Sequence, residues 1–304
     1  MAVSLSNFVG QPEAAPAHKI KVVTSFLPLY CFSANIAGDL AQVENLLPPG
    51  ASPHDYDFSP SDLRRLKDAD LIILNGLGLE DWLEKAFPTT DRKTSAQVVE
   101  VATGLGEELI TENQSNQDEP RRKESATHSE NGNAIQANPH IWLDPKLALH
   151  SVTNILRALQ KADPAHAEIF ARNAAAYATR LEKLDADLQA GLAPFTNAPF
   201  VTLHQAFPYF TRRYGLKVAG VIETTPEVEP SSRHLHKLAG IVREQKVKAI
   251  FTEVQSPSKL ARQFARDLHI SVAELDTLET GSFTLTAYED GMRKNLEILR
   301  QALK

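Results

Sequence analysis

Two patterns of apolar and polar residues alternate along most of the chain. Short runs of apolar or alternating residues predict β-strands, and longer stretches with apolar residues every three or four positions predict helices. The runs that predict strands lie at 19–25, 43–47, 71–75, 98–101, 200–203, 217–222, 249–252 and 271–275. Because helical patterns separate these runs, the sequence predicts an α/β fold with parallel sheets.

One predicted helix is much longer than the others. Its apolar residues recur at steps of three and four from Phe170 to Leu188, and Asp163 followed by Pro164 is a typical helix start. A helix over 163–189 would be roughly 40 Å long, enough to join two lobes. We therefore predict two α/β lobes with parallel sheets and one long connecting helix. The predicted domains are an N-terminal lobe at 19–161, the connecting helix at 162–192 and a C-terminal lobe at 193–304.

Two segments do not fit this pattern. Residues 1–18 contain no Lys or Arg, yet Ala15-Pro16-Ala17 has the A-x-A form of a signal-peptide cleavage site. We interpret 1–18 as a disordered or residual signal segment; the alternative is a disordered tail on a cytoplasmic protein. Residues 111–137 are polar, with one aliphatic residue beyond alanine, and predict a long mobile loop.

Composition limits the partners that the protein can bind and the residues that could form a metal site. The formal net charge is −6, and no concentrated run of Lys and Arg occurs, which argues against nucleic acid as a partner. No apolar stretch approaches the roughly 20 residues of a membrane span. Cys31 is the only cysteine, so a metal site in this chain would be built from His, Asp and Glu.

Three of the ten histidines lie where a ligand site is expected. His54 is in a turn after a predicted strand, His140 is in a segment between two prolines, and His204 ends a strand, as Asp276 does. Ligands of open parallel sheets bind beyond the carboxyl ends of the strands. Three imidazoles and one carboxylate, two from each lobe, would suit Zn²⁺ between the lobes. A hydrogen-bonded core or surface role would also explain each histidine, and spacing alone leaves both interpretations open.

Six segments carry a resemblance to a known family. In order and spacing they resemble the zinc-binding, TroA-like family of ABC-transporter substrate-binding proteins. The segments are PHDYDFSPSD (53–62), NPHIWLDP (138–145), LHQAFPYFTRRYGLKVAGV (203–221), PEVEPSS (226–232), IFTEVQSPSKLA (250–261) and YEDGMRKNLEILRQAL (288–303).

The resemblance implies a metal carrier and not an enzyme. It implies that His54, His140, His204 and Asp276 bind the metal and that the partner is an ABC-type permease in the membrane. It also implies a periplasmic or extracellular, membrane-associated location, and we expect a monomer. Relatives that resemble manganese carriers have Glu where this chain has His204, so the imidazole favours zinc.

Several alternatives stay open on the sequence. The chain could carry manganese or another divalent metal. It could also be a zinc-dependent hydrolase with Glu253 as its base, although four protein ligands argue against the open position that such an enzyme needs. A third alternative is an adhesin in which the metal is structural. Glu253 also has two readings, a hydrogen-bond acceptor for a ligand histidine or a solvated strand end.

Overall fold

A computed structural model describes residues 19–57, 59–86, 96–111, 137–223, 228–256 and 258–304. The predicted signal or disordered segment at 1–18 lies outside these residues, as does nearly all of the predicted loop at 111–137. The two ends of that loop are described: Thr111 and Ala137 pair in an isolated antiparallel bridge.

The first lobe contains a four-stranded parallel sheet in the order β2-β1-β3-β4. Its strands are β1 (Ile20–Thr24), β2 (Ala41–Asn45), β3 (Leu71–Leu74) and β4 (Gln97–Glu100). The helices that connect them are α1 (Leu27–Ala37), α2 (Pro60–Lys67) and α3 (Asp81–Ala86). Every residue of β3 is buried, as expected of an inner strand covered on both faces.

The second lobe repeats this arrangement with the sheet order β6-β5-β7-β8, again parallel. Its strands are β5 (Pro199–Thr202), β6 (Lys217–Val221), β7 (Ala249–Glu253) and β8 (Ser271–Leu275). Its helices are α7 (Pro208–Tyr214), α8 (Ser232–Glu244) and α9 (Lys259–Leu268). The predicted fold class, two α/β lobes with parallel sheets, is confirmed.

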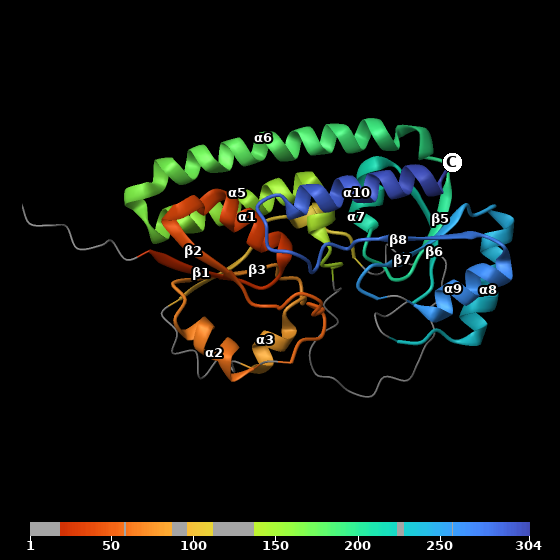
Figure 1. The fold of residues 1–304 in the computed structure, drawn as a ribbon, viewed down its shortest axis with the longest axis horizontal. Helices are drawn as coiled ribbons and strands as arrows, with labels where there is room; N and C mark the ends of the chain where they lie inside the picture. The colour runs from red at the N-terminus through yellow and green to blue at the C-terminus, as the bar shows by residue number, and fades with distance from the viewer. Residues whose placement is uncertain (1–18, 58, 87–95, 112–136, 224–227, 257) are drawn as a thin grey trace, which may run out of the picture.

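The long connecting helix is α6 (Ala167–Leu192), which runs along one side of both lobes (Figure 1). It begins slightly later than predicted, because Pro164–His166 forms a 3-10 turn. The predicted apolar stripe is its buried face. It packs against α5 (Pro145–Ala162) and α1 from the first lobe and against α10 (Ala287–Ala302) from the end of the chain.

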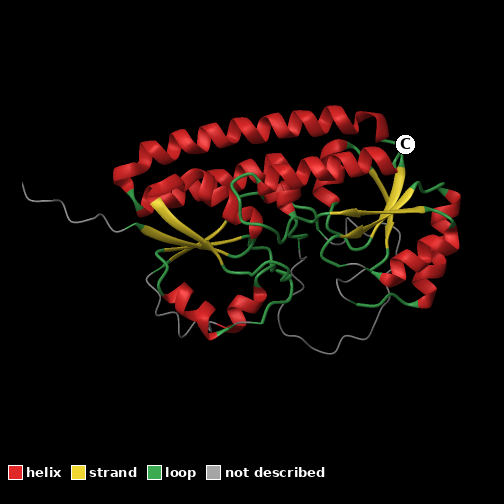
Figure 2. Cartoon of the chain, viewed as in Figure 1, coloured by secondary structure: helices red, strands yellow, loops and turns green. Residues whose placement is uncertain are grey.

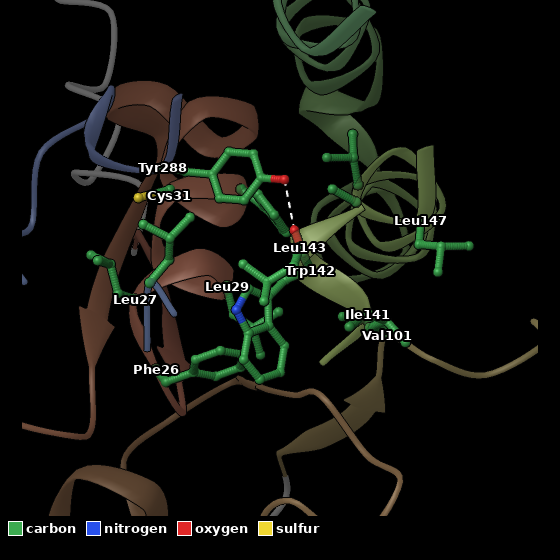
Figure 3. Packing of buried hydrophobic residues seen from close by; sticks show 14 of the residues in the cluster. Phe26, Leu27, Leu29, Cys31, Val101, Ile141, Trp142, Leu143, Leu147 and Tyr288 are labelled. Carbon is green, nitrogen blue, oxygen red and sulfur yellow. Dashed lines mark hydrogen bonds between the residues drawn. The ribbon is translucent and has the colours of Figure 1, made fainter. Parts of the chain in front are cut away.

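A continuous hydrophobic core joins the lobes. One cluster of buried residues includes β1, α5, α6 and α10 together with the inner face of the second sheet, and a smaller cluster fills the space under α8 and α9. Trp142 lies in the larger cluster, edge-on to Phe26 with 4.6 Å between ring centroids. Figure 3 shows Tyr288 of α10 reaching the carbonyl of Trp142, to which its hydroxyl donates at 2.7 Å. The lobes are therefore held together by packing as well as by chain connection.

The predicted strand boundaries agree with the structure to within one residue, except in β2, where both ends lie two residues earlier. β2 is Ala41–Asn45, so Leu46 and Leu47 of the predicted run at 43–47 lie just beyond the strand, where both side chains are buried. Their backbone N–H groups still donate to the carbonyls of Thr24 and Ser25, at 2.7 and 3.1 Å, and burial of the two side chains explains their apolar character. Among the helices that the structure describes, none combines the length and the apolar character needed to cross a bilayer.

Candidate metal centre

Loops from both sheets meet in the middle of the molecule (Figure 2). Four side chains of the described residues converge there. Each of them offers one ligand atom, and these atoms all lie within 4.8 Å of one another. Across the described part of the chain, no second group of three or more His, Cys, Asp or Glu side chains meets this criterion. The four residues are His54, His140, His204 and Glu279.

His54 lies in the loop between β2 and α2 of the first lobe. The neighbouring carbonyl of Pro53 accepts a hydrogen bond from the indole N–H of Trp82 in α3, at 2.7 Å. The ring of Tyr56 also packs edge-on against Trp82. The side chain of His54 is 21% exposed, whereas the other three of the group are 3–7% exposed. His54 is therefore the member of the group that faces solvent.

His140 lies just before a buried 3-10 turn at Ile141–Leu143. Its backbone N–H and its Nδ1 both contact Oδ1 of Asn138 at 3.0 Å. An amide oxygen can only accept, so Nδ1 carries the proton and Nε2 presents a lone pair. Asn138 in turn donates to the carbonyl of Gln205 in the second lobe. The ring of His140 is thus oriented by a residue that is tied to both lobes.

His204 follows β5, and a carboxylate from the neighbouring strand orients it. Nδ1 of His204 donates to Oε1 of Glu253, the last residue of β7, at 2.5 Å, and both side chains are buried. The backbone N–H of His204 contacts the same oxygen at 3.3 Å. Nε2 is therefore available as a ligand atom, which is the carboxylate–histidine arrangement common at metal sites. Of the two predicted readings of Glu253, the structure supports the hydrogen-bond acceptor.

The distances between the four ligand atoms fit a small tetrahedral ion. Nε2 of His140 lies 3.2 Å from Nε2 of His54 and 3.2 Å from Nε2 of His204. Oε1 of Glu279 lies 3.5 Å from Nε2 of both His54 and His140. Zinc–ligand bonds of about 2.0–2.1 Å in a tetrahedron give ligand–ligand edges of about 3.3 Å. The four separations of 3.2–3.5 Å are close to this edge, and all four atoms lie within 4.8 Å of one another.

Electrostatics keep His140 neutral and Glu279 ionised, the states in which they can bind a cation. Burial, reinforced by His204 and His54 and opposed by the charge of Glu279, lowers the pKa of His140 to about 3, so its imidazole is neutral. Burial alone would raise the pKa of Glu279, but the approach of His140 and His54 outweighs burial and holds the pKa well below its usual range. For His204, burial acts to lower the pKa, yet the hydrogen bond and charge of Glu253 raise it.

One carboxylate oxygen has no hydrogen-bond donor. Oε1 of Glu279, the atom that faces the histidines, is buried and accepts no hydrogen bond within the described residues. A buried charged oxygen without a partner is costly, because its desolvation is not compensated. A cation among the four ligand atoms would compensate it. The donor set therefore fits a divalent metal ion by charge as well as by spacing.

Asp276, the fourth residue of the predicted set, is not in this group. It follows β8 directly, and its Oδ1 accepts from Nε2 of Gln255 at 2.5 Å and from the backbone N–H of Leu278 at 2.8 Å. The chain then turns, and Glu279 enters the cluster instead. The structure thus brings together three of the four predicted residues and replaces the fourth with a carboxylate three positions later.

The sequence contains a weak signal for Glu279. The segment after the predicted strand, Asp276-Thr277-Leu278-Glu279, holds two carboxylates, and the one nearer the strand is the simpler choice. The support that Asn138 gives to His140 is equally hard to foresee, although Asn138 begins the same NPH segment. The roles of Glu279 and Asn138 both depend on the direction in which a turn points the side chain, and the residue types do not reveal that direction.

Comparison with known proteins agrees with this geometry. The sequence model of the family described as "Zinc-uptake complex component A periplasmic" (ZnuA) matches residues 22–302. The chain belongs to the ZnuA family. It is 33% identical over 292 residues to zinc-binding protein AdcA of Streptococcus pyogenes, covering 93% of this chain and 56% of that protein. The chain thus spans just over half the length of the AdcA relatives it matches.

Other relatives of this ZnuA-family chain are described with iron or with zinc. The iron-binding protein YfeA of Yersinia pestis is 36% identical over 253 residues, covering 83% of this chain and 75% of that protein. Among solved structures, a Zn(II)-bound mutant variant of AdcAII from Streptococcus pneumoniae superposes with a TM-score of 0.80 at 29% identity. That comparison covers 95% of this chain and 100% of the other. The family is thus one of metal-binding components of uptake systems.

Proposed function

We propose that this protein captures Zn²⁺ between its two lobes and delivers it to an ABC-type permease. In this proposal His54, His140 and His204 bind the ion through Nε2, and Glu279 binds it through Oε1. The observation that carries the proposal is the convergence of these four atoms at nearly tetrahedral spacing, with one carboxylate oxygen unpaired. Zinc is the transported ligand and not a resident cofactor.

The donor set favours zinc over the other metals of the family. Three imidazole nitrogens and one carboxylate oxygen suit a tetrahedral Zn²⁺ site, whereas Mn²⁺ prefers more oxygen ligands and six-coordinate geometry. The Irving–Williams order also ranks Zn²⁺ above Mn²⁺ and Fe²⁺ for such ligands. A carrier of manganese or iron is the second candidate, since one relative is named an iron-binding protein and one structural neighbour was solved in complex with Mn²⁺.

A carrier agrees better with the site than a hydrolase does. Catalytic zinc usually has three protein ligands and keeps an open position for water. Here four protein atoms surround the candidate position. Glu253, the base that a hydrolase would need, already accepts the hydrogen bond from Nδ1 of His204.

The remaining parts of the proposal concern the cell and the assembly. We propose that the carrier acts as a monomer on the periplasmic or extracellular side of the membrane, where the family description places such components. Its functional units are the N-terminal lobe at 19–161, the connecting helix at 162–192 and the C-terminal lobe at 193–304. The partner would be the membrane permease that accepts the ion.

A competitive zinc titration of metal-stripped protein tests the ligand assignment. We expect one tight site per chain, and we expect His204→Ala to weaken it by more than the about 10–100-fold typical of supporting residues. His236→Ala is the matched control, because His236 is an exposed histidine of α8 outside the group. Absence of a tight site, or equal affinity of the His204 variant and the control, would refute the assignment.

Metal preference and delivery need separate measurements. Competition of Mn²⁺ and Fe²⁺ against Zn²⁺ for the stripped protein should leave zinc bound at equal concentrations. Uptake of zinc into vesicles that contain the permease should require the carrier and should be lost with the His204→Ala variant. Uptake that does not depend on the carrier would contradict the transport part of the proposal and leave zinc binding intact.

A further inference from the structure

The turn that carries Glu279 begins at a firmly held position. Asn295 of α10 is buried, and its side chain forms two hydrogen bonds with the backbone of Asp276. Its Oδ1 accepts from the N–H of Asp276 at 2.8 Å, and its Nδ2 donates to the carbonyl of Asp276 at 2.7 Å. The backbone at the end of β8 is therefore fixed by the C-terminal helix.

Beyond this point the chain adopts a conformation that its residues do not favour. Leu278 has φ of 61°, in the left-handed region that a leucine rarely occupies. Its side chain is buried against Gly291 of α10, where an added Cβ would lie 2.2 Å from Cδ2 of Leu278. Such a conformation is strained and persists only where the surroundings hold it, here the packing on Gly291 together with hydrogen bonds to the turn.

The side chain of Asp276 supplies such a hydrogen bond. Its Oδ1 accepts from the backbone N–H of Leu278 at 2.8 Å, and the same oxygen accepts from Nε2 of Gln255 at 2.5 Å. Gln255 follows β7 by two residues, and its Oε1 also contacts the hydroxyl of Thr277 at 3.4 Å. The carboxylate thus joins the end of β7 to the residue directly before Glu279.

We propose that Asp276 is a positioning residue for the metal centre, acting through Glu279, and that Gln255 supports it. The inference rests on the proposed function, because it takes Glu279 as a ligand. The end of β7 and the residues after it would then orient two ligands, His204 through Glu253 and Glu279 through Gln255 and Asp276. Asp276 itself does not contact the ion.

This role requires the hydrogen-bond-accepting oxygen Oδ1 of Asp276 and not the negative charge of the side chain. Asp276→Asn keeps an oxygen that accepts from Leu278 and Gln255, whereas Asp276→Ala removes it. We therefore expect Asp276→Ala to weaken zinc binding by about 10–100-fold and Asp276→Asn to stay within a few-fold of the parent protein. Asp267→Ala is the matched control, since it removes an exposed Gln–Asp hydrogen bond, from Gln263, within α9.

A double-mutant cycle with Glu279→Gln tests whether Asp276 acts through Glu279. If it does, Asp276→Ala weakens zinc binding in the parent protein and adds almost nothing when Glu279→Gln is present. The visible absorption of the Co²⁺-loaded protein gives a second readout, because it reports the metal's coordination. The spectrum of Asp276→Ala should change toward that of Glu279→Gln, and the spectrum of Asp276→Asn should match the parent.

Gln255→Ala tests the same role in case Asp276→Ala does not fold. Gln255→Ala removes one donor to Asp276 and leaves the bond from Leu278 in place. It should weaken zinc binding several-fold in the parent protein and not in the Glu279→Gln background.

The outcomes separate the two proposals. Equal losses in Asp276→Asn and Asp276→Ala would overturn the positioning role and indicate that the charge itself contacts the ion. A full additional loss in the Glu279→Gln background would overturn it too, because Asp276 would then act independently of Glu279. If Glu279→Gln alone leaves zinc affinity and the Co²⁺ spectrum unchanged, the proposed ligand set fails and this inference fails with it. A loss in Glu279→Gln without one in either Asp276→Ala or Gln255→Ala overturns only the positioning role.

Discussion

Trp142 in the first lobe donates its indole N–H to the carbonyl of Thr277 in the second lobe, at 2.7 Å. Both residues are buried. Trp142 comes two residues after His140, and Thr277 comes two residues before Glu279. The hydrogen bond therefore joins the segments that present two of the candidate ligands, one from each lobe. This contact sets the distance between the lobes close to the metal centre.

Replacing this indole should destabilise the protein. Trp142→Phe keeps an aromatic ring in the core but leaves the buried carbonyl of Thr277 without its donor. We expect the free energy of unfolding to fall by about 1–3 kcal/mol, with a further contribution from the smaller ring. Urea unfolding of the metal-free protein measures this. Trp82→Phe is a useful comparison, because it removes an indole hydrogen bond to Pro53 within the first lobe only.

Trp142→Phe should also bind zinc more weakly than the parent protein. Trp142→Phe breaks a contact between lobes, so zinc binding should become weaker because the His140 and Glu279 segments are less well placed in the metal-free protein. If Trp142→Phe loses stability while its zinc affinity equals that of the parent, the contact does not preorganise the site.

Glu253→Gln should weaken zinc binding without removing a ligand. The carboxylate of Glu253 accepts from Nδ1 of His204 at 2.5 Å and makes its Nε2 a better donor to the metal. We expect affinity at pH 8 to fall by about 10–100-fold. Glu274→Gln is the control, since Glu274 is an exposed residue of β8 that pairs with Arg262. Equal effects of the two substitutions would contradict a specific role for Glu253.

Protons should compete with zinc, but not at every histidine. The hydrogen bond and charge of Glu253 raise the pKa of His204, so protons compete with zinc at this imidazole, and affinity should fall as the pH drops through that pKa. Because the pKa of His140 is about 3, His140 should contribute no competition between pH 5 and 7.5. Calorimetry in buffers of different ionisation enthalpy should count fewer than three protons released per zinc ion. A count of three would contradict a neutral His140.

A buried acid away from the metal should make stability depend on pH. Burial raises the pKa of Glu80 to about 7, although Ser25 and the N–H groups of Asn75 and Gly76 donate to it. An acid whose pKa is higher in the folded state contributes stability that is fully present at pH values below its unfolded pKa of 4.5. This contribution to the free energy of unfolding is lost as the pH rises through about 7. The shift of 7 − 4.5 = 2.5 corresponds to about 3 kcal/mol.

Glu80→Gln should remove this dependence. Urea unfolding of the metal-free variant between pH 4.5 and 8 should give a flatter profile than that of the parent, even if the variant is less stable throughout. Glu244→Gln, an exposed substitution at the end of α8, should keep the parent profile. Parallel profiles for the parent and Glu80→Gln would show that Glu80 is ionised over the whole range.

The sequence predicted those parts of the molecule that depend on side-chain polarity. The strands and the stripe of α6 follow from burial. The positions of the three histidines made them candidates, and the family resemblance, not the spacing, implied that they act together. Glu279 could not be chosen over Asp276 in this way. The choice depends on the left-handed backbone of Leu278, and leucine does not predict such a turn. The hydrogen bond from Trp142 to Thr277 was likewise out of reach, since it joins residues 135 positions apart.

Removal of the metal should weaken the protein without unfolding it. The hydrophobic core runs through α6 and α10 and does not include the four candidate ligands, so the fold has its own source of stability. Free zinc at 100 times its dissociation constant should add about 2.7 kcal/mol to the free energy of unfolding, and a chelator should remove that amount. His204→Ala should respond much less to either treatment, whereas His236→Ala should respond as the parent does. Unfolding on chelation would instead mean that the metal is structural, which a carrier that must release its ion cannot tolerate.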